Sequence, residues 1–176
     1  CAQTQESPLK EKVESYAVVE VTSPLDDALS ENDKKIVALF RQAGEIMDGL
    51  FWKQTFGDKT EMEALTDEYA KAYAMINYGP WDHLDNNAPF VEGYGEKPLG
   101  CQYYPHDMTM EEWNAFDDPD KLNLYTVVRR DENGALKTVW YRDEYKEELD
   151  QVCALLEEAA SLTENDGMRT YLTERV

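Results

Sequence analysis

The stretch SENDKKIVALFRQAGEIMDGLF, residues 30–51, decides most of the fold. Its apolar side chains recur every three or four positions, so they form one broad stripe along a helix of about five turns. The stripe consists of Ile36, Val37, Leu39, Phe40, Ala43, Ile46, Met47, Leu50 and Phe51. Ser30 is a suitable N-cap, and the acidic residues after it favour the positive end of the helix dipole. A helix with so wide an apolar face has to pack against other elements.

Two more long helices are predicted to pack with this one. Residues 60–77 begin with the capping-box pattern TEME, and their stripe stops before Gly79 and Pro80. Glycine there can take a left-handed conformation and proline cannot continue a helix. Residues 142–163 carry the third stripe. Shorter helices are expected after the capping box at Thr109 and from about residue 166 to the end.

The remaining regular structure is a small antiparallel β element. Two β-rich runs within residues 125–141 flank Asn133-Gly134, which is a strong hairpin signal. The run YAVVEV, residues 16–21, is β-prone and predicts a short strand that pairs with this hairpin. The predicted fold class is therefore α+β, mostly α, with residues 16–176 as a single domain.

Residues 80–108 follow no period and are rich in proline, glycine and aromatic side chains. A loop of this length in a compact domain is uncommon unless it is functional or packed by its own side chains. The aromatic residues favour a packed loop.

The charge of the chain is unusual. Among its 176 residues, 37 Asp and Glu outnumber 17 Lys and Arg, which gives a formal net charge of −20. Such a surface repels phosphate backbones, so nucleic acid is not expected as a partner. No apolar run approaches the roughly 20 residues that a membrane helix needs.

The first residue suggests an anchor of another kind. Cys1 is followed by a polar segment, as in a bacterial lipoprotein whose signal peptide has been removed and whose terminal cysteine carries lipid. On this interpretation residues 1–15 are a tether, and the membrane is a partner only through the lipid anchor. The expected location is the bacterial cell envelope, periplasmic or surface-exposed. The alternative is a terminus that falls on a cysteine by chance.

The other two cysteines, Cys101 and Cys153, have no metal-ligand spacing. A disulfide between them is possible in an oxidising compartment, whereas the apolar stripe around Cys153 favours a small buried residue.

Candidate catalytic groups are few. The two histidines, His83 and His106, belong to no HExxH or HExxxH motif, so surface histidines are favoured over zinc ligands. Residues 82–87 superficially suggest a calcium loop but lack its glycine and its distal glutamate. No Gly-x-Ser-x-Gly elbow occurs, and Glu96 follows Gly93-Tyr94-Gly95 where a phosphate loop would need neutral residues.

Several strings nevertheless resemble a known family. These are IMDGLFWKQ at 46–54, INYGPWDHL at 76–84, PFVEG at 89–93, YYPHDMT at 103–109 and LYTVVRRD at 124–131. The chain from about residue 17 to its end resembles the N-terminal region of bacterial proteins related to dipeptidyl-peptidase III, which are zinc-dependent metallopeptidases. The INYGPWD string is the most specific element.

The resemblance implies a two-lobed enzyme that removes dipeptides from peptide N-termini. In that family two histidines of a HExxxH helix and a later glutamate hold zinc, and the glutamate of HExxxH is the general base. None of these motifs occurs in the 176 residues. The resemblance therefore implies that zinc belongs to the full-length parent, that this chain binds none and is inactive alone, and that its partners are a peptide substrate and the C-terminal catalytic part.

On this resemblance, we expect the substrate to lie at the turn that follows the second predicted helix. Asn77 and Asp82 are expected to be polar contacts, and Tyr78 and Trp81 to be walls of the cleft. The carbonyl end of a helix, together with Asp82, favours the ammonium group of a peptide. The alternative is that Tyr78 and Trp81 merely plug the base of the helix.

The sequence is also compatible with a second function. Tyrosine and tryptophan are good contact residues, so the loop 80–108 could hold peptide or glycan in a lipid-anchored accessory or binding protein.

Overall fold

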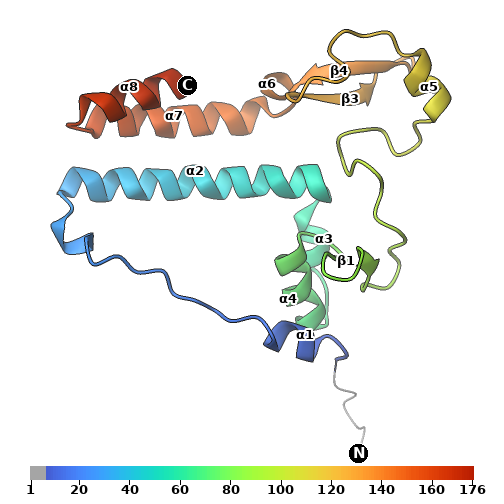
Figure 1. The fold of residues 1–176 in the computed structure, drawn as a ribbon, viewed down its shortest axis with the longest axis horizontal. Coiled ribbons are helices and arrows are strands. Elements are labelled where there is room, and N and C mark those ends of the chain that lie inside the picture. Colours follow the sequence, from blue (N-terminus) through green and yellow to red (C-terminus); the bar gives the residue numbers. More distant parts are fainter. Residues whose placement is uncertain (1–6) are drawn as a thin grey trace, which may run out of the picture. The chain divides into compact units, whose positions relative to one another are not determined.

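A computed structural model of the protein describes residues 7–176 (Figure 1). Cys1, the predicted lipidation site, lies outside the described residues. The elements are α1 (Lys10–Glu14), η1 (Asp26–Ala28), α2 (Glu31–Thr55), α3 (Lys59–Glu63), α4 (Glu68–Asn77), β1 (Trp81–Asp82), β2 (Ala88–Pro89), α5 (Met110–Ala115), β3 (Thr126–Arg130), β4 (Leu136–Trp140), α6 (Tyr141–Glu144), α7 (Lys146–Leu162) and α8 (Asp166–Arg175). The predicted fold class, α+β and mostly α, is confirmed.

The chain packs as two compact units. Unit 1 contains the described residues up to Glu20 together with Trp52–His106, and unit 2 contains Val21–Phe51 together with Asp107–Val176. Helix α2 supplies residues to both. The prediction of one domain over residues 16–176 concerns independent folding and stays a prediction.

Unit 2 is built on the predicted stripe of α2. Ser30 caps the helix, since its hydroxyl accepts from the Asp33 amide at 3.1 Å. Helix α7 runs antiparallel beside α2, and α8 lies against α7 (Figure 1). Ile36 and Leu39 of α2 form a buried cluster with Ala159 and Ala160 of α7 and Leu172 of α8. The helix predicted over 142–163 is observed as α6 and α7, and α8 matches the predicted final helix.

The predicted hairpin is also observed in unit 2. Strands β3 and β4 pair antiparallel, with Thr126 opposite Trp140 and Arg130 opposite Leu136. The turn between them uses Gly134 at φ +83°, a conformation that glycine adopts without strain. The Asp131 carboxylate accepts from the amides of Asn133 and Ala135, both at 2.9 Å.

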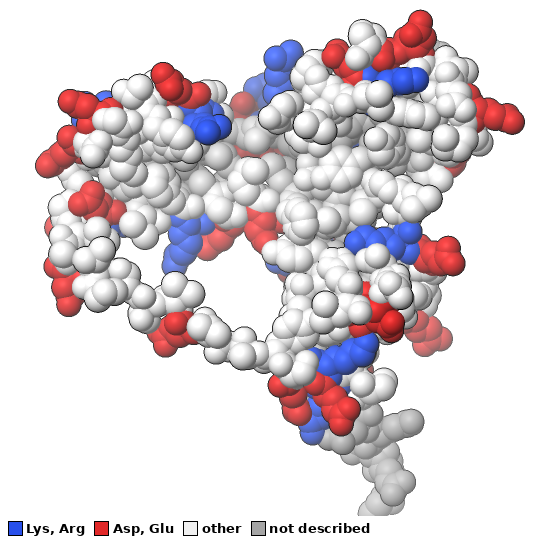
Figure 2. Space-filling model, viewed as in Figure 1, with Lys and Arg blue, Asp and Glu red and all other residues white. Residues whose placement is uncertain are grey.

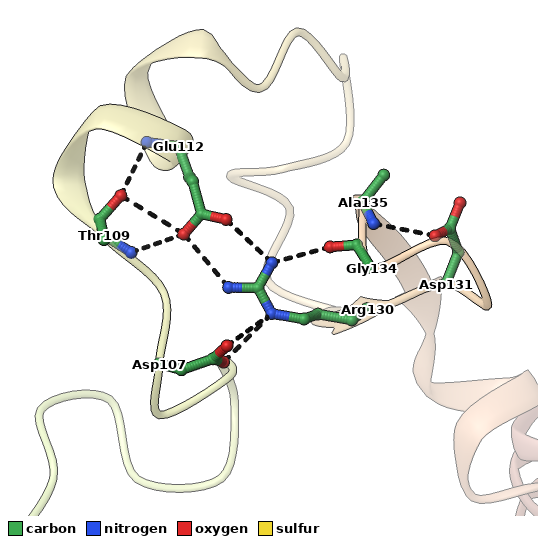
Figure 3. Close-up of polar contacts among 7 residues, drawn as sticks. All are labelled: Asp107, Thr109, Glu112, Arg130, Asp131, Gly134 and Ala135. Atoms are coloured by element: carbon green, nitrogen blue, oxygen red, sulfur yellow. Dashed lines mark hydrogen bonds and ion pairs between the residues drawn. The ribbon is translucent and has the colours of Figure 1, made fainter.

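Arg130 ties this hairpin to α5 (Figure 3). Its guanidinium donates to both oxygens of Glu112, at 2.9 and 3.1 Å, and to Asp107 at 3.0 Å. Glu112 also completes the predicted capping box with Thr109. The hydrogen bonds from Arg130 and the Thr109 amide lower the pKa of Glu112 to about 2.

Unit 1 differs from the prediction at the second helix. Instead of one helix over 60–77, the chain forms α3 and α4 with a break between them. The break follows from capping: the Asp67 carboxylate accepts from the Tyr69 and Ala70 amides and starts a new helix. At the start of α3 the cap is Asp58, which accepts from the Thr60 amide, and not the predicted box at Thr60.

The predicted strand at residues 16–21 is wrong. The two sheets of the described chain are the pairs β1–β2 and β3–β4, and neither includes this segment. Val18, Val19 and Val21 are 101%, 77% and 94% exposed. Valine favours strands because it packs on a half-buried pleated surface, and no such surface meets the segment here.

The predicted tether needs a second correction. Residues 7–15 are not a mobile tether, because α1 forms within them and packs on α4. Leu9 is buried, and the Ser7 hydroxyl donates to Asp67 at 2.7 Å.

Among residues 7–176, no helix combines the length and apolar character needed to cross a membrane.

The unit 2 core yields a stability prediction. Ile36 is 2% exposed and its neighbour Val37 is 55% exposed. We expect Ile36→Ala to lower the free energy of unfolding by about 2–5 kcal/mol, since it removes buried methyl groups and leaves a cavity. Val37→Ala is the control and should cost less than about 1 kcal/mol. Urea titration followed by circular dichroism measures both, and equal losses would contradict the packing of α2.

A second prediction concerns acid stability. Because the pKa of Glu112 in the folded protein lies below that of the unfolded chain, its stabilising contribution is present above about pH 4.5. This contribution is lost as the pH falls toward 2. Glu112→Gln should therefore lower Tm at pH 7, and the difference from the natural protein should shrink below pH 4. The control is Glu111→Gln, on the exposed neighbour; if its Tm shows the same pH dependence, the Arg130 contact is not the cause.

Candidate functional site

The predicted site is the turn that joins α4 to β1. Helix α4 ends in a residue with left-handed geometry, and that residue is Tyr78, at φ +53°, rather than the expected glycine alone. Gly79 follows at φ +146°, and a Cβ there would lie 3.3 Å from the Trp81 ring. Left-handed geometry costs a tyrosine about 1–2 kcal/mol, so the surroundings must hold the turn in this shape.

Asn77 is one of the groups that hold it. The side chain is 3% exposed. Its amide nitrogen donates to the Tyr73 carbonyl at 3.0 Å, and its amide oxygen accepts from the His83 backbone amide at 3.0 Å. Asn77 thus fastens the last turn of α4 to the residue after β1.

Asp82 is the second such group and the most buried carboxylate of the turn, at 2% exposure. It pairs with Lys12 of α1, accepts from the Leu84 amide at 2.9 Å and accepts from the Tyr73 hydroxyl. Burial alone would raise the pKa of Asp82, but these three donors hold it below its usual value. Burial and the bond to Asp82 raise the pKa of Tyr73 to about 12, so the phenol stays protonated.

The two aromatic residues of the turn belong to the core of unit 1. Trp81 is 6% exposed and packs with Phe56 at a centroid distance of 5.9 Å. Its indole nitrogen donates to the Gly95 carbonyl at 2.8 Å. Tyr78 is half-buried, with its ring 5.1 Å from that of Trp52. Trp81 therefore plugs the base of α4, and Tyr78 is the more accessible of the pair.

The loop after the turn is packed through its aromatic side chains, as its composition predicted, and these contact aromatic residues of α4 and of the segment after α2. Phe90 lies 4.8 Å from Tyr73, and Tyr94 lies 5.7 Å from Phe56. The Tyr94 hydroxyl donates to Glu61 at 2.8 Å. Trp81 is buried, whereas Phe90 and Tyr94 are half-buried against the core of unit 1, so part of each of these two rings is exposed.

Metal ligation is not supported by the described residues. Across residues 7–176, no three His, Cys, Asp or Glu side chains come close enough to hold a metal ion. His83 instead lies 3.0 Å from the Lys97 ammonium, and the Asp82 carboxylate is already satisfied by protein donors. Cys101 and Cys153 are free thiols, each half-buried, so the fully buried position expected for Cys153 is not observed.

The structure thus brings Asn77, Tyr78, Trp81 and Asp82 together on one tight turn. Contact of these four residues with a substrate stays a prediction. Sequence reasoning missed Lys12 and Tyr73, which complete the network around Asp82. The apolar pair Leu9 and Val13 was the available signal for α1, since residues four apart share a helix face.

The Asp82 network gives a testable energetic asymmetry. Lys12→Met leaves a buried carboxylate without its cation, which should cost on the order of 3 kcal/mol of unfolding free energy. The double variant Lys12→Met/Asp82→Asn removes the charge as well, so it should be more stable than Lys12→Met alone. Thermal and urea unfolding at pH 7 measure the difference. If the double variant loses as much unfolding free energy as Lys12→Met and Asp82→Asn lose together, the two residues do not interact.

No family model matches the chain. A curated relative, Nudix hydrolase 3 from Arabidopsis thaliana, is 29% identical, and the match covers 69% of this chain and 21% of the plant protein.

Two solved structures are similar over nearly the whole chain. DPP III from Caldithrix abyssi is 30% identical with a TM-score of 0.85, and the match covers 94% of this chain and 34% of that one. Dipeptidyl-peptidase III from Corallococcus sp. strain EGB is 30% identical with a TM-score of 0.86, over 95% of this chain and 34% of that one. The fold of this chain is therefore similar to that of a part of dipeptidyl-peptidase III, and the chain spans about one third of the length of these structures.

Proposed function

We propose that the chain is the part of a zinc-dependent dipeptidyl peptidase that lines the substrate cleft opposite the zinc site. The observation that carries this proposal is the similarity to two dipeptidyl-peptidase III structures, at TM-scores of 0.85 and 0.86 and 30% identity. Since the match covers only 34% of those chains, the parent protein would supply the remaining length, and with it the catalytic residues.

Within this function the turn after α4 would be a rigid wall of the cleft. Asn77 and Asp82 hold the turn through contacts inside the chain, and Trp81 anchors it in the core. Tyr78 is the half-buried member, so it is the residue of the four that we expect to touch a peptide. A fixed wall positions a substrate at little entropic cost.

The net negative charge of the chain favours attraction of the positively charged N-terminus of a peptide. A surface with a formal charge of −20 raises the local concentration of cations, including the ammonium group of a peptide. Acidic side chains are scattered over the face shown in Figure 2 rather than gathered in one patch, so the attraction would be long-range and not site-specific.

Zinc would be held outside this chain. The described residues offer no cluster of three ligands, and the donors around Asp82 leave its carboxylate no free role at a metal. This chain would then bind no zinc and hydrolyse nothing alone. Its own contribution would be to bind and orient the peptide, and lipidation of Cys1 would keep the parent protein at the cell envelope.

Other functions are less well supported. The plant match covers only 21% of that protein, so its name transfers no activity to this chain. The accessory-protein alternative rests on an aromatic loop, in which Trp81 is buried and Phe90 and Tyr94 are half-buried against the core of unit 1.

The experiment uses the complete open reading frame that encodes this chain. We expect the complete protein to release dipeptides from dipeptidyl arylamides, to lose this activity with a zinc chelator and to regain it with added zinc. The 176-residue chain should show neither turnover nor stoichiometric zinc after dialysis. A complete protein without a HExxxH motif, or without dipeptide release, would contradict the proposal.

A matched pair of tyrosine variants of the complete protein tests the role of the turn. Tyr78→Ala should raise KM and lower kcat/KM about tenfold, which corresponds to about 1.4 kcal/mol of binding free energy. The control is Tyr171→Ala on α8, where the tyrosine is 56% exposed. Equal turnover by the two variants would show that the turn is purely structural.

A further inference from the structure

The segment 17–22 has no partner in the described chain. Figure 1 draws it as a coil between α1 and η1. Within residues 7–176 none of its backbone amides or carbonyls takes part in a hydrogen bond. Its valine side chains are among the most exposed apolar groups of the protein, with Val18 at 101% and Val21 at 94%.

Its sequence is nevertheless that of a half-buried strand. In an extended chain Ala17, Val19 and Val21 lie on one face, and Val18, Glu20 and Thr22 lie on the other. The first face is wholly apolar and the second carries a charge, which is the pattern of a strand with one side in a core. Exposure of Val19 and Val21 to water is unfavourable, so the segment favours a conformation that buries the face on which they lie.

Both ends of the segment are defined. Tyr16, just before it, packs edge-on against Tyr73 of α4 at 6.2 Å, so the segment starts from a fixed point of unit 1. Ser23-Pro24 ends it, because proline has no amide hydrogen to donate to a neighbouring strand. Six residues are the usual length of a strand.

We propose that residues 17–22 add as an edge strand to a β-sheet in the part of the parent protein that lies outside this chain. This inference rests on the proposed function, in which a longer parent exists. The matched peptidase structures are about three times as long as the match, so the additional chain is large enough to carry a sheet. Strand addition satisfies the free backbone groups and buries one face of side chains at the same time.

The other possible partners fit less well. A second copy of the chain would bring two surfaces of −20 charge together, which opposes association. The two sheets of the described residues, β1–β2 and β3–β4, do not include the segment. The sheet edge of the parent is therefore the occupant to which the proposal commits.

Hydrogen exchange provides the direct test. Amide exchange of residues 17–22 is followed by mass spectrometry in the 176-residue chain and in the complete protein. We expect exchange in the complete protein to be at least a hundredfold slower, because a paired strand protects its amides. Leu99, 98% exposed in the loop of unit 1, marks the control peptide. If segment 17–22 exchanges equally fast in both proteins, strand addition is wrong.

A pair of variants tests which face is buried. In the complete protein, Val19→Lys should abolish the slow exchange, whereas Val18→Lys on the opposite face should leave it within about threefold. In the 176-residue chain neither variant should change Tm, since both side chains face water. Val19→Thr replaces Val19→Lys if the lysine variant does not fold, and should accelerate exchange more than Val18→Thr. Equal effects of the two positions would overturn the assignment of the buried face.

The test separates this inference from the proposed function. Slow exchange in a complete protein without peptidase activity would support the strand and contradict the enzyme. Fast exchange in an active peptidase would do the reverse. Slow exchange that depends on protein concentration would indicate a second copy as the partner and would overturn the proposal.

Discussion

The apolar stripe of α2 is the constraint on which the rest of the structure depends. The helix is 25 residues long, and its predicted stripe is only partly buried, since Val37, Met47 and Phe51 are exposed. Ile36 and Leu39 are buried in unit 2, against α7 and α8, while Trp52 in the last turn of the helix is buried in unit 1. Each core therefore contains a section of the same helix, and the loss of α2 would remove a wall from both. A helix with such a stripe is stable only because both ends find partners.

Within unit 1 the second constraint is polar. A buried carboxylate is tolerated when donors surround it, and Asp82 has three, from α1, α4 and the β1–β2 turn. Lys12 lies 70 residues before Asp82 in the sequence, so this pair joins the start of unit 1 to its middle. Four residues before Asp82, Tyr78 has a left-handed conformation that a tyrosine does not favour. Rigid placement of one aromatic side chain is what a wall of a binding cleft requires.

Local signals predicted the local structure. The stripe of residues 30–51, the capping box at Thr109 and the turn at Asn133-Gly134 each encode their element within a few residues, and all three appear as predicted. One helix was predicted where two form, because the N-cap at Asp67 was overlooked. The Asp67 carboxylate accepts from two backbone amides and starts a new helix, so α3 and α4 replace the single predicted helix. The strand at 16–21 failed because β-propensity requires a neighbouring strand, which a single segment cannot specify.

The turn after α4 was predictable from the sequence, whereas its contacts were not. INYGPWD marked the turn, but Lys12 reaches Asp82 across about 70 residues, a separation that no periodicity records. The net charge of −20 does not by itself indicate a binding site, because several acidic side chains have local structural roles. Asp58 and Asp67 cap helices, Glu112 pairs with Arg130 and Asp131 shapes the hairpin turn. The pKa values of Asp58, Asp67 and Glu112 are lowered by their hydrogen bonds, so the three side chains stay ionised and contribute to the negative field of the protein as well.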